Sequence, residues 1–194
     1  MIHNDVLRRL RFALRINDTL AIKLFKIVDY DMDPKYLANI MKKEEEPGYL
    51  PCRDKLLAFF LDALIIHNRG KREGEVYQPP RSGQRLTNNE ILRKIRIAMS
   101  YQDNDIIALL KLVDFSIGKT ELSALFRRPD HRNYKECGDQ LLRNLLNGMV
   151  AKLRPESKAK SEKKVNTNKK YKSDRKPNKS TPTNTSVWGQ VKKR

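Results

Sequence analysis

The chain has 194 residues, which is enough for one mid-sized domain or two small ones, and its formal net charge is +18. Its polar N-terminal residues and the lack of any apolar run of membrane-spanning length argue against a signal peptide and a transmembrane helix. The two cysteines, Cys52 and Cys137, lie far apart without any CxxC pair, which argues against a zinc site and a disulfide framework. We therefore expect a cytoplasmic protein without metal or cofactor.

The first predicted helix covers residues 4–16, where apolar side chains recur with the i, i+3, i+4, i+7 spacing of an amphipathic helix. Asn4 is of a residue type that caps helices, so we expect it at the N-cap. Arg8, Arg11 and Arg15 line the face opposite the apolar one. This segment is therefore predicted to be an amphipathic helix with a basic outer face.

Two shorter helices are predicted next. Asp18 is expected to cap the second helix, which is nearly all apolar on one side, and residues 29–32 form the turn after it. Asp33 followed by Pro34 predicts the start of a third helix, because a capping carboxylate precedes a proline at the first helical position. This third helix is predicted to end near Lys43.

The fourth predicted helix is the most apolar one. Residues 44–51 are polar and contain Pro-Gly, which predicts a loop, and the helix follows over residues 53–68 with Gly70 placed to end it. Glycines, prolines and mixed charge then mark residues 71–86 as a linker. We expect this helix to form the centre of its unit.

The pattern restarts after the linker, because residues 89–99 repeat residues 4–14 in the same order. The match continues without a gap at the following pairs: Asp18 and Asp103, Asp29 and Asp114, Leu37 and Leu122, Tyr49 and Tyr134, Cys52 and Cys137, Asp54 and Asp139. Chance would not hold one register over about 65 residues, so we interpret the chain as a duplication. The predicted fold is all-α: four-helix repeats at residues 1–70 and 87–155, about eight helices in all, followed by a disordered tail at residues 156–194.

The N-[DE]-x-L-R-x-x-R-x-A openings and the Y-x-x-C-x-D-x-L-L segments, each present once per repeat at the same spacing, resemble the YehS-like family of bacterial proteins. Residues 137–140, with residues 129–131 before them, are particularly similar to the second repeat of that family. The resemblance covers about residues 1–155. It implies a small all-α bacterial cytoplasmic protein with two copies of a domain of unknown function, and it supplies no catalytic residues. Family members tend to end soon after the second repeat, so the tail looks like an extension.

Two arginines of the first helix recur in the second repeat, which makes Arg8, Arg11, Arg93 and Arg96 the best candidates for phosphate contacts in the helical repeats. Their recurrence on one helical face predicts two related phosphate-binding faces. The alternative is a solvated helix face, or ion pairs within the chain with acidic residues such as Asp29. The sequence alone leaves both interpretations open.

The second and third helices of each repeat could also form a helix-turn-helix that reads DNA. The third helix would then offer cations to phosphates and Asn39 to a base edge. These cations are Lys35, Lys42 and Lys43 in the first repeat and Lys119, Arg127 and Arg128 in the second. Two amphipathic helices joined by a turn are common in all-α proteins, and this turn is longer than the tight form, so the pattern has low specificity.

Signatures of enzymes are missing from the sequence, which contains no GxxxxGK[ST], no GxGxxG after a strand, no HExxH and no GxSxG. Cys52 and Cys137 each precede a predicted helix, where the helix dipole could lower the pKa of a thiol. A buried structural cysteine is the commoner case, and the histidines His67 and His131 do not occupy equivalent positions. We therefore expect no enzyme, with a small residual chance through these two thiols.

The C-terminal segment carries most of the positive charge. Residues 151–194 hold 15 Lys or Arg against 3 acidic residues, a net charge of +12, and such a segment should be disordered and attract polyanions. Tyr171 and Trp188 add rings that can stack on unpaired bases. The candidate contacts of the tail are Lys163, Lys164, Lys169, Lys170, Lys172, Arg175, Lys176 and Trp188. Alternatively, the tail only solubilises the protein, or the apolar island at Trp188 docks on a partner protein.

From these observations we expect a non-enzymatic cytoplasmic protein associated with nucleic acid, with RNA or the ribosome favoured over a DNA operator. One alternative is a helix-turn-helix DNA-binding regulator. Another is a protein-interaction module in which the two repeats form a groove and the basic tail is incidental.

Overall fold

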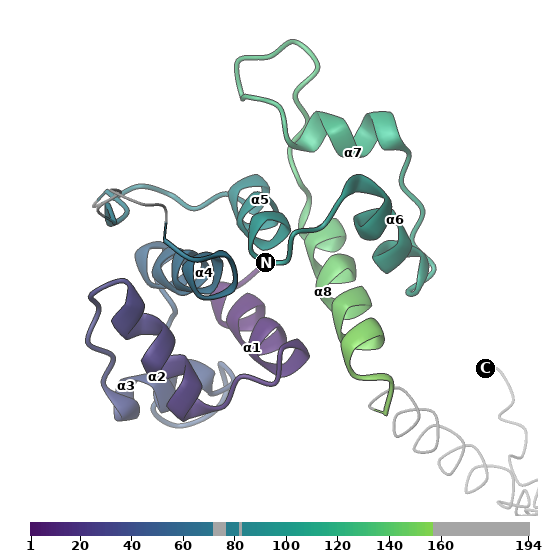
Figure 1. Cartoon of the computed structure of the whole chain (residues 1–194). Helices are drawn as coiled ribbons and strands as arrows, with labels where there is room; N and C mark the ends of the chain where they lie inside the picture. Colours follow the sequence, from purple (N-terminus) through teal and green to yellow (C-terminus); the bar gives the residue numbers. More distant parts are fainter. Residues whose placement is uncertain (72–76, 82, 157–194) are drawn as a thin grey trace, which may run out of the picture. The chain divides into compact units, whose positions relative to one another are not determined.

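The computed structural model describes residues 1–71, 77–81 and 83–156, and these contain eight α-helices and no β-strand (Figure 1). The helices are α1 (His3–Ala13), α2 (Asp18–Ile27), α3 (Pro34–Met41), α4 (Asp54–Arg69), α5 (Asn88–Ala98), α6 (Asp103–Lys111), α7 (Lys119–Leu125) and α8 (Asp139–Leu153). Helices α5 to α8 follow α1 to α4 at the spacing of the sequence repeat. The predicted all-α fold of two four-helix units is confirmed.

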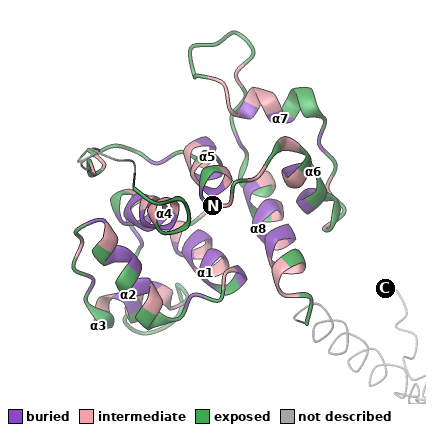
Figure 2. Cartoon of the chain, viewed as in Figure 1, coloured by how far each residue is buried: buried purple, intermediate pink, exposed green. Residues whose placement is uncertain are grey.

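The two repeats pack against each other through a reciprocal pair of contacts. Within the repeats, α4 packs against α2 and α8 packs against α6. Between the repeats, α4 packs against α5, and α8 packs against α1, which is the same contact after a shift of one repeat. In Figure 2, the ribbons of α1, α4, α5 and α8 each carry residues coloured as buried. The repeats therefore share one hydrophobic core and form a single compact unit.

Equivalent side chains fill the core in both repeats. Leu7 and Leu10 of α1 are fully buried, as are Leu92 and Ile95 at the matching positions of α5. The apolar spacing in the sequence thus marks the inward face of each first helix. Burying a leucine or isoleucine side chain stabilises the fold by about 1.5–3 kcal/mol. Each first helix is consequently bound both to its own repeat and to the other one.

Asn4 does not cap α1, contrary to the prediction. The N-cap is Ile2, and the Asn4 side chain lies inside the first turn, where it is 1% exposed. Its amide nitrogen donates to the backbone carbonyls of Ile40 at 2.8 Å and Leu50 at 2.9 Å, and its oxygen accepts from the backbone N–H of Cys52 at 2.9 Å. Asn4 therefore ties the segment before α4 and the end of α3 to α1.

Asn89 makes the same three bonds in the second repeat. It donates to the carbonyls of Leu125 and Lys135 and accepts from the N–H of Cys137 at 2.9 Å. The N-cap of α5 is Thr87, whose side chain accepts from the third residue of the helix in a capping box. The asparagine recurs in the sequence because a buried amide satisfies three backbone groups, and not because it caps a helix.

Of the other predicted helix ends, two are confirmed and one is wrong. Asp33 accepts from the N–H of Lys35 and caps α3, and Gly70 ends α4 at φ +81°, as predicted. The prediction that Asp18 caps α2 is wrong, because Asn17 is the N-cap and accepts from the backbone of the helix. Asp18 is instead the first residue of α2.

Non-glycine residues with positive φ end the first two helices of each repeat. They are Arg15 and Ser100 after the first helices, and Asp29 and Asp114 after the second, with φ between 54° and 57°. The left-handed conformation lets a residue beyond the helix donate back to a carbonyl of the last turn, as in a Schellman motif. Asp tolerates this conformation better than most side chains, which accounts for its recurrence at the second position.

Helices α6 and α8 approach each other at Gly148. A Cβ atom at this position would lie 2.2 Å from the carbonyl oxygen of Leu109, so only glycine fits there. The equivalent residue of α4 is Ala63, which is fully buried. Helix α8 thus lies against α6 at a distance that excludes even a methyl group.

Candidate nucleic-acid interface

Arg8 and Arg93, the first pair of recurring arginines, hold the ends of the third helices. The guanidinium of Arg8 donates to the carbonyl of Lys42 at 2.7 Å and also pairs with Asp5. Arg93 donates to the carbonyl of Phe126 at 3.0 Å and is exposed. Both arginines thereby satisfy carbonyls that a helix end leaves without an intrahelical partner.

The second pair, Arg11 and Arg96, fastens the turn between the first two helices. Arg11 is 8% exposed, and it donates to the carbonyl of Ile16 at 3.3 Å and to Asp18 at 2.5 Å. Arg96 donates in the same way to the carbonyl of Tyr101 at 3.2 Å and pairs with Asp103 at 2.8 Å. The acidic partners are therefore Asp18 and Asp103, and not Asp29 or Asp114.

The structure brings Arg93 and Arg96 together at one residue, Phe126. Arg93 donates to the backbone carbonyl of Phe126, and the guanidinium of Arg96 lies 4.5 Å from the centre of the Phe126 ring. A cation over an aromatic ring is stabilised by the electrons of the ring face. The recurring arginines of the second repeat consequently border the start of the loop between α7 and α8.

The helix-turn-helix candidate has a short third helix whose C-terminal end is covered. α3 has eight residues, and the loop after it returns so that the N–H of Leu50 donates to the carbonyl of Asn39 at 3.3 Å. The ammonium of Lys42 is held by the carbonyl of Pro47 at 2.8 Å. Lys35 and Lys43 are exposed, whereas Lys42 is half-buried. Of these three lysines, Lys35 and Lys43 are therefore the ones that a duplex could reach directly.

The loop after α7 carries a second group of arginines, separate from the four recurring ones. Phe126, Arg127, Arg128, Asp130, His131 and Arg132 line a shallow depression. Arg132 has no counterpart in the first repeat, where Pro47 stands, so comparing the repeats could not find it. The local excess of arginine in residues 127–132 was the available signal.

The predicted tail contacts, namely Lys163, Lys164, Lys169, Lys170, Lys172, Arg175, Lys176 and Trp188, lie outside the residues that the structure describes. Their part in nucleic-acid binding stays a prediction from composition.

The two cysteines are buried, and their thiols are held in the protonated form. Burial raises the pKa of Cys52 to about 12, and the charge of Asp54 adds to this effect. Burial likewise raises the pKa of Cys137 to about 11, again with a contribution from a carboxylate, Asp139. The low thiol pKa that a helix N-terminus could give is therefore not found. Both residues instead place a backbone N–H against the buried asparagine of their repeat.

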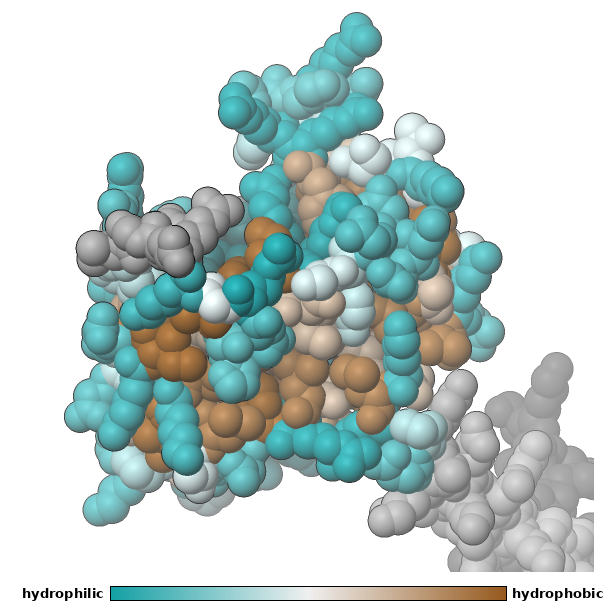
Figure 3. Space-filling view, viewed as in Figure 1, coloured by the Kyte–Doolittle hydropathy of each residue, from teal (hydrophilic) through white to brown (hydrophobic). Residues whose placement is uncertain are grey.

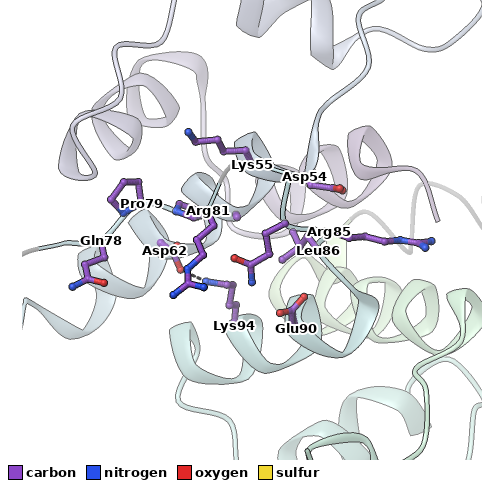
Figure 4. Close-up of a pocket in the computed structure, with 13 residues that line it drawn as sticks. Asp54, Lys55, Asp62, Gln78, Pro79, Arg81, Arg85, Leu86, Glu90 and Lys94 are labelled. Atoms are coloured by element: carbon purple, nitrogen blue, oxygen red, sulfur yellow. Dashed lines mark hydrogen bonds and ion pairs between the residues drawn. The ribbon is translucent and has the colours of Figure 1, made fainter. Parts of the chain in front are cut away.

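A cavity of about 270 Å³ lies between α4, α5 and the linker (Figure 4). Its charged side chains are of both signs: Asp54, Asp62 and Glu90 against Lys55, Arg81, Arg85 and Lys94. Asp62 is already satisfied, because it pairs with Lys94 and accepts a hydrogen bond from Tyr77 at 3.2 Å. A cavity with such balanced charge does not select a ligand of one sign, and the linker that closes it is present once in the chain.

Among the residues that the structure describes, no three His, Cys, Asp or Glu side chains come together in a way that could hold a metal ion. No helix among the same residues is both long enough and apolar enough to cross a membrane.

Comparison with known proteins matches two parts of the chain, residues 3–70 and 88–154, to a family described as "Protein of unknown function (DUF1456)". The chain is also similar to the uncharacterized protein YehS of Escherichia coli (strain K12), with 37% identity over 152 residues. This similarity covers 78% of the chain and 96% of YehS. No solved structure matches the chain. With both repeats matched separately and the relative covered almost completely, the chain belongs to the DUF1456 family and carries two copies of its domain.

Proposed function

We propose that this protein is a non-enzymatic, cytoplasmic, nucleic-acid-associated protein, and that its target is RNA, free or in the ribosome, in preference to DNA. The observation that carries the proposal is the charge of the chain. Its net charge is +18, and residues 151–194 hold 15 basic against 3 acidic residues. A cationic segment of this density displaces counterions from a polyanion, which gives affinity that depends strongly on salt.

The aromatic residues of the tail favour RNA over duplex DNA as the target. Tyr171 and Trp188 are placed among the lysines of the tail, and flat rings stack on bases that are unpaired, as they are in RNA loops. Groove reading would ask for an exposed recognition helix, whereas the C-terminal end of α3 is covered by its own loop. The alternative to RNA is a partner protein that binds near Trp188.

The arginines Arg8, Arg11, Arg93 and Arg96 have a different place in this proposal. Their guanidinium groups hold carbonyls and carboxylates of the same repeat, so they shape the surface on which RNA would lie. Arg93 is the one of the four that is exposed, and it is the best placed to contact phosphate directly.

The test compares the full chain with a chain that ends at Glu156. Binding to a fluorescein-labelled 20-nucleotide RNA is measured by fluorescence anisotropy over a series of KCl concentrations. Each phosphate contact that is lost reduces the slope of log K against log salt by about 0.7 for a single strand, so we expect much weaker and flatter binding by the shortened chain. Full retention of binding and slope would overturn the proposal.

A second pair of variants separates charge from stacking. Replacing Tyr171 and Trp188 by Ala leaves the charge intact, so it should lower affinity without changing the salt slope. Replacing Lys169, Lys170 and Lys172 by Gln should lower the slope instead. A stable protein partner that survives nuclease and high salt would favour the interaction module over RNA binding.

A further inference from the structure

The loops that follow the third helix in the two repeats share three backbone hydrogen bonds. In residues 127–133, here called the arginine loop, the N–H of His131 donates to Arg128 at 3.0 Å. Just beyond it, Tyr134 donates to His131 at 2.8 Å and Lys135 donates to Ala124 at 3.3 Å. The loop is thus closed on α7 by its own backbone and has a defined conformation.

The corresponding segment of the first repeat is residues 42–48, here called the glutamate loop. There the N–H of Glu46 donates to Lys43 at 3.0 Å, Tyr49 donates to Glu46 at 3.1 Å, and Leu50 donates to Asn39 at 3.3 Å. These are the same three bonds at the matching positions of the other repeat. The two loops therefore share these three bonds, although Gly48 has a positive φ of 79° and its counterpart Asn133 does not.

The side chains give the two loops opposite charge. The glutamate loop has two lysines and three glutamates, a net charge of −1. The arginine loop has three arginines and one aspartate, a net charge of +2 with His131 neutral. A polyanion that approaches the repeats is attracted by one loop and repelled by the other.

The arginines of this loop are available to a ligand. Arg128 and Arg132 are exposed and Arg127 is half-buried. Within the part of the chain that the structure describes, the guanidinium groups of these three arginines form no ion pair and no side-chain hydrogen bond. The recurring arginines Arg8, Arg11, Arg93 and Arg96, in contrast, are bound to their own repeat. Figure 3 shows strongly hydrophilic side chains at the top of the face in view, where the loop after α7 projects in Figure 1.

We propose that the arginine loop is the surface by which the folded repeats contact the phosphates of RNA, with Arg93 at its edge. This proposal rests on the proposed function and assigns it to one repeat. The planar guanidinium group binds phosphate oxygens in pairs, which a lysine cannot do. A protein partner would call for an apolar centre, and none of the large exposed apolar side chains among the described residues lies in this loop.

The test uses the full chain and a triple variant, Arg127→Gln, Arg128→Gln and Arg132→Gln. The matched control is Lys23→Gln, Lys26→Gln and Lys111→Gln, three exposed lysines away from the loop whose loss lowers the net charge equally. RNA binding is measured by anisotropy with the same 20-nucleotide RNA, and thermal unfolding by circular dichroism confirms that both variants are folded.

For the loop variant we expect the salt slope to fall by about 2, at about 0.7 for each of three phosphate contacts. We expect RNA affinity to fall about tenfold or more. For the control we expect at most about a threefold loss and an unchanged slope, since distant exposed charges are screened. Equal losses in the two variants would overturn the assignment to the loop while leaving RNA binding standing. If the unmodified chain does not bind RNA at 50 mM salt, about 14 Å of Debye screening length, both proposals fail.

Discussion

Asp62 of α4 pairs with Lys94 of α5, and Asn147 of α8 pairs with Arg9 of α1 at the positions one repeat away. The two contacts join the repeats at equivalent places with different chemistry. One couples a carboxylate to a cation, and the other couples an amide oxygen to a cation. The two pairs therefore allow an ion pair and an amide–cation hydrogen bond to be compared at equivalent positions of the contact between the repeats.

Replacing Asp62 by Asn, and Asn147 by Asp, should change the free energy of unfolding by small amounts in opposite directions. Asp62→Asn recreates the Asn147 contact, so we expect the free energy of unfolding to fall by about 1 kcal/mol, whereas Asp62→Ala also leaves Tyr77 unpaired and should cost about 2 kcal/mol. Asn147→Asp, which creates an ion pair with Arg9, should leave stability unchanged or raise it slightly. Urea unfolding at pH 7 measures all three, and a larger loss for Asn147→Asp than for Asp62→Asn would contradict this account.

The buried asparagines should be among the most sensitive positions of the fold. Asn4→Ala leaves two carbonyls and one N–H without a partner, so we expect a loss of about 3 kcal/mol, and Asn89→Ala should be similar. Asn4→Asp should also destabilise the protein, because a carboxylate cannot donate to the carbonyls of Ile40 and Leu50. Asn104→Ala at an exposed position of α6 serves as the control, with a change within about 0.5 kcal/mol.

Gly148 reverses the usual effect of replacing a helical glycine. In an exposed helix Gly→Ala stabilises by about 1 kcal/mol, but here the new methyl group would strike the carbonyl of Leu109. We expect Gly148→Ala to destabilise the protein by about 1–3 kcal/mol, the range for overpacked cores. Thermal unfolding measures the effect. A rise in Tm would show that α6 and α8 do not approach so closely.

Alkaline pH should weaken the fold through the two cysteines. Their pKa values are raised to about 12 for Cys52 and about 11 for Cys137, so the folded chain keeps protons that the unfolded chain releases above about pH 8.5. The stability that they contribute is present below that pH and is lost as the pH rises toward the folded values, by about 1 kcal/mol per cysteine for each pH unit.

The measurement for the thiols is urea unfolding at pH 8 to 10, with the double variant Cys52→Ala and Cys137→Ala as the reference. The stability difference between the unmodified protein and the variant should shrink as the pH rises. Iodoacetamide should label the folded protein far more slowly than the unfolded one. Rapid labelling of the folded protein at pH 7.5 would instead reveal a reactive thiolate.

Local signals and the repeat predicted much of this fold. The cap at Asp33 and the stop at Gly70 depend on neighbouring residues alone, so short patterns suffice to find them. The register that matches Asn4 to Asn89 predicts the positions of the helices in both repeats, because the pattern of each helix occurs once in each copy. Apolar periodicity marked the buried face of each helix, although it could not say which helix would cover that face. The reciprocal contacts of α4 with α5 and of α8 with α1 therefore emerged only from the structure.

The candidate site was harder to predict, since identical sequence signals can serve the interior or the surface. The preference of asparagine for helix caps predicts a cap at Asn4, and yet the hydrogen bonds of Asn4 go to residues 36 to 48 positions away. The recurrence of Arg11 and Arg96 pointed to function, whereas their partners are the carbonyls and carboxylates of their own repeat. Arg132 has no counterpart in the first repeat, so recurrence between the repeats could not point to it.

The reciprocal packing of the repeats has a consequence for what the protein can present to a partner. A symmetric dimer of one repeat would have to display two identical loops, because each subunit has the same sequence. Joining both copies in one polypeptide removes that restriction. One loop can carry arginines while its counterpart carries glutamates, and both belong to repeats that share one core. Fusion has thus given a two-fold arrangement two loops of opposite net charge, one in each repeat.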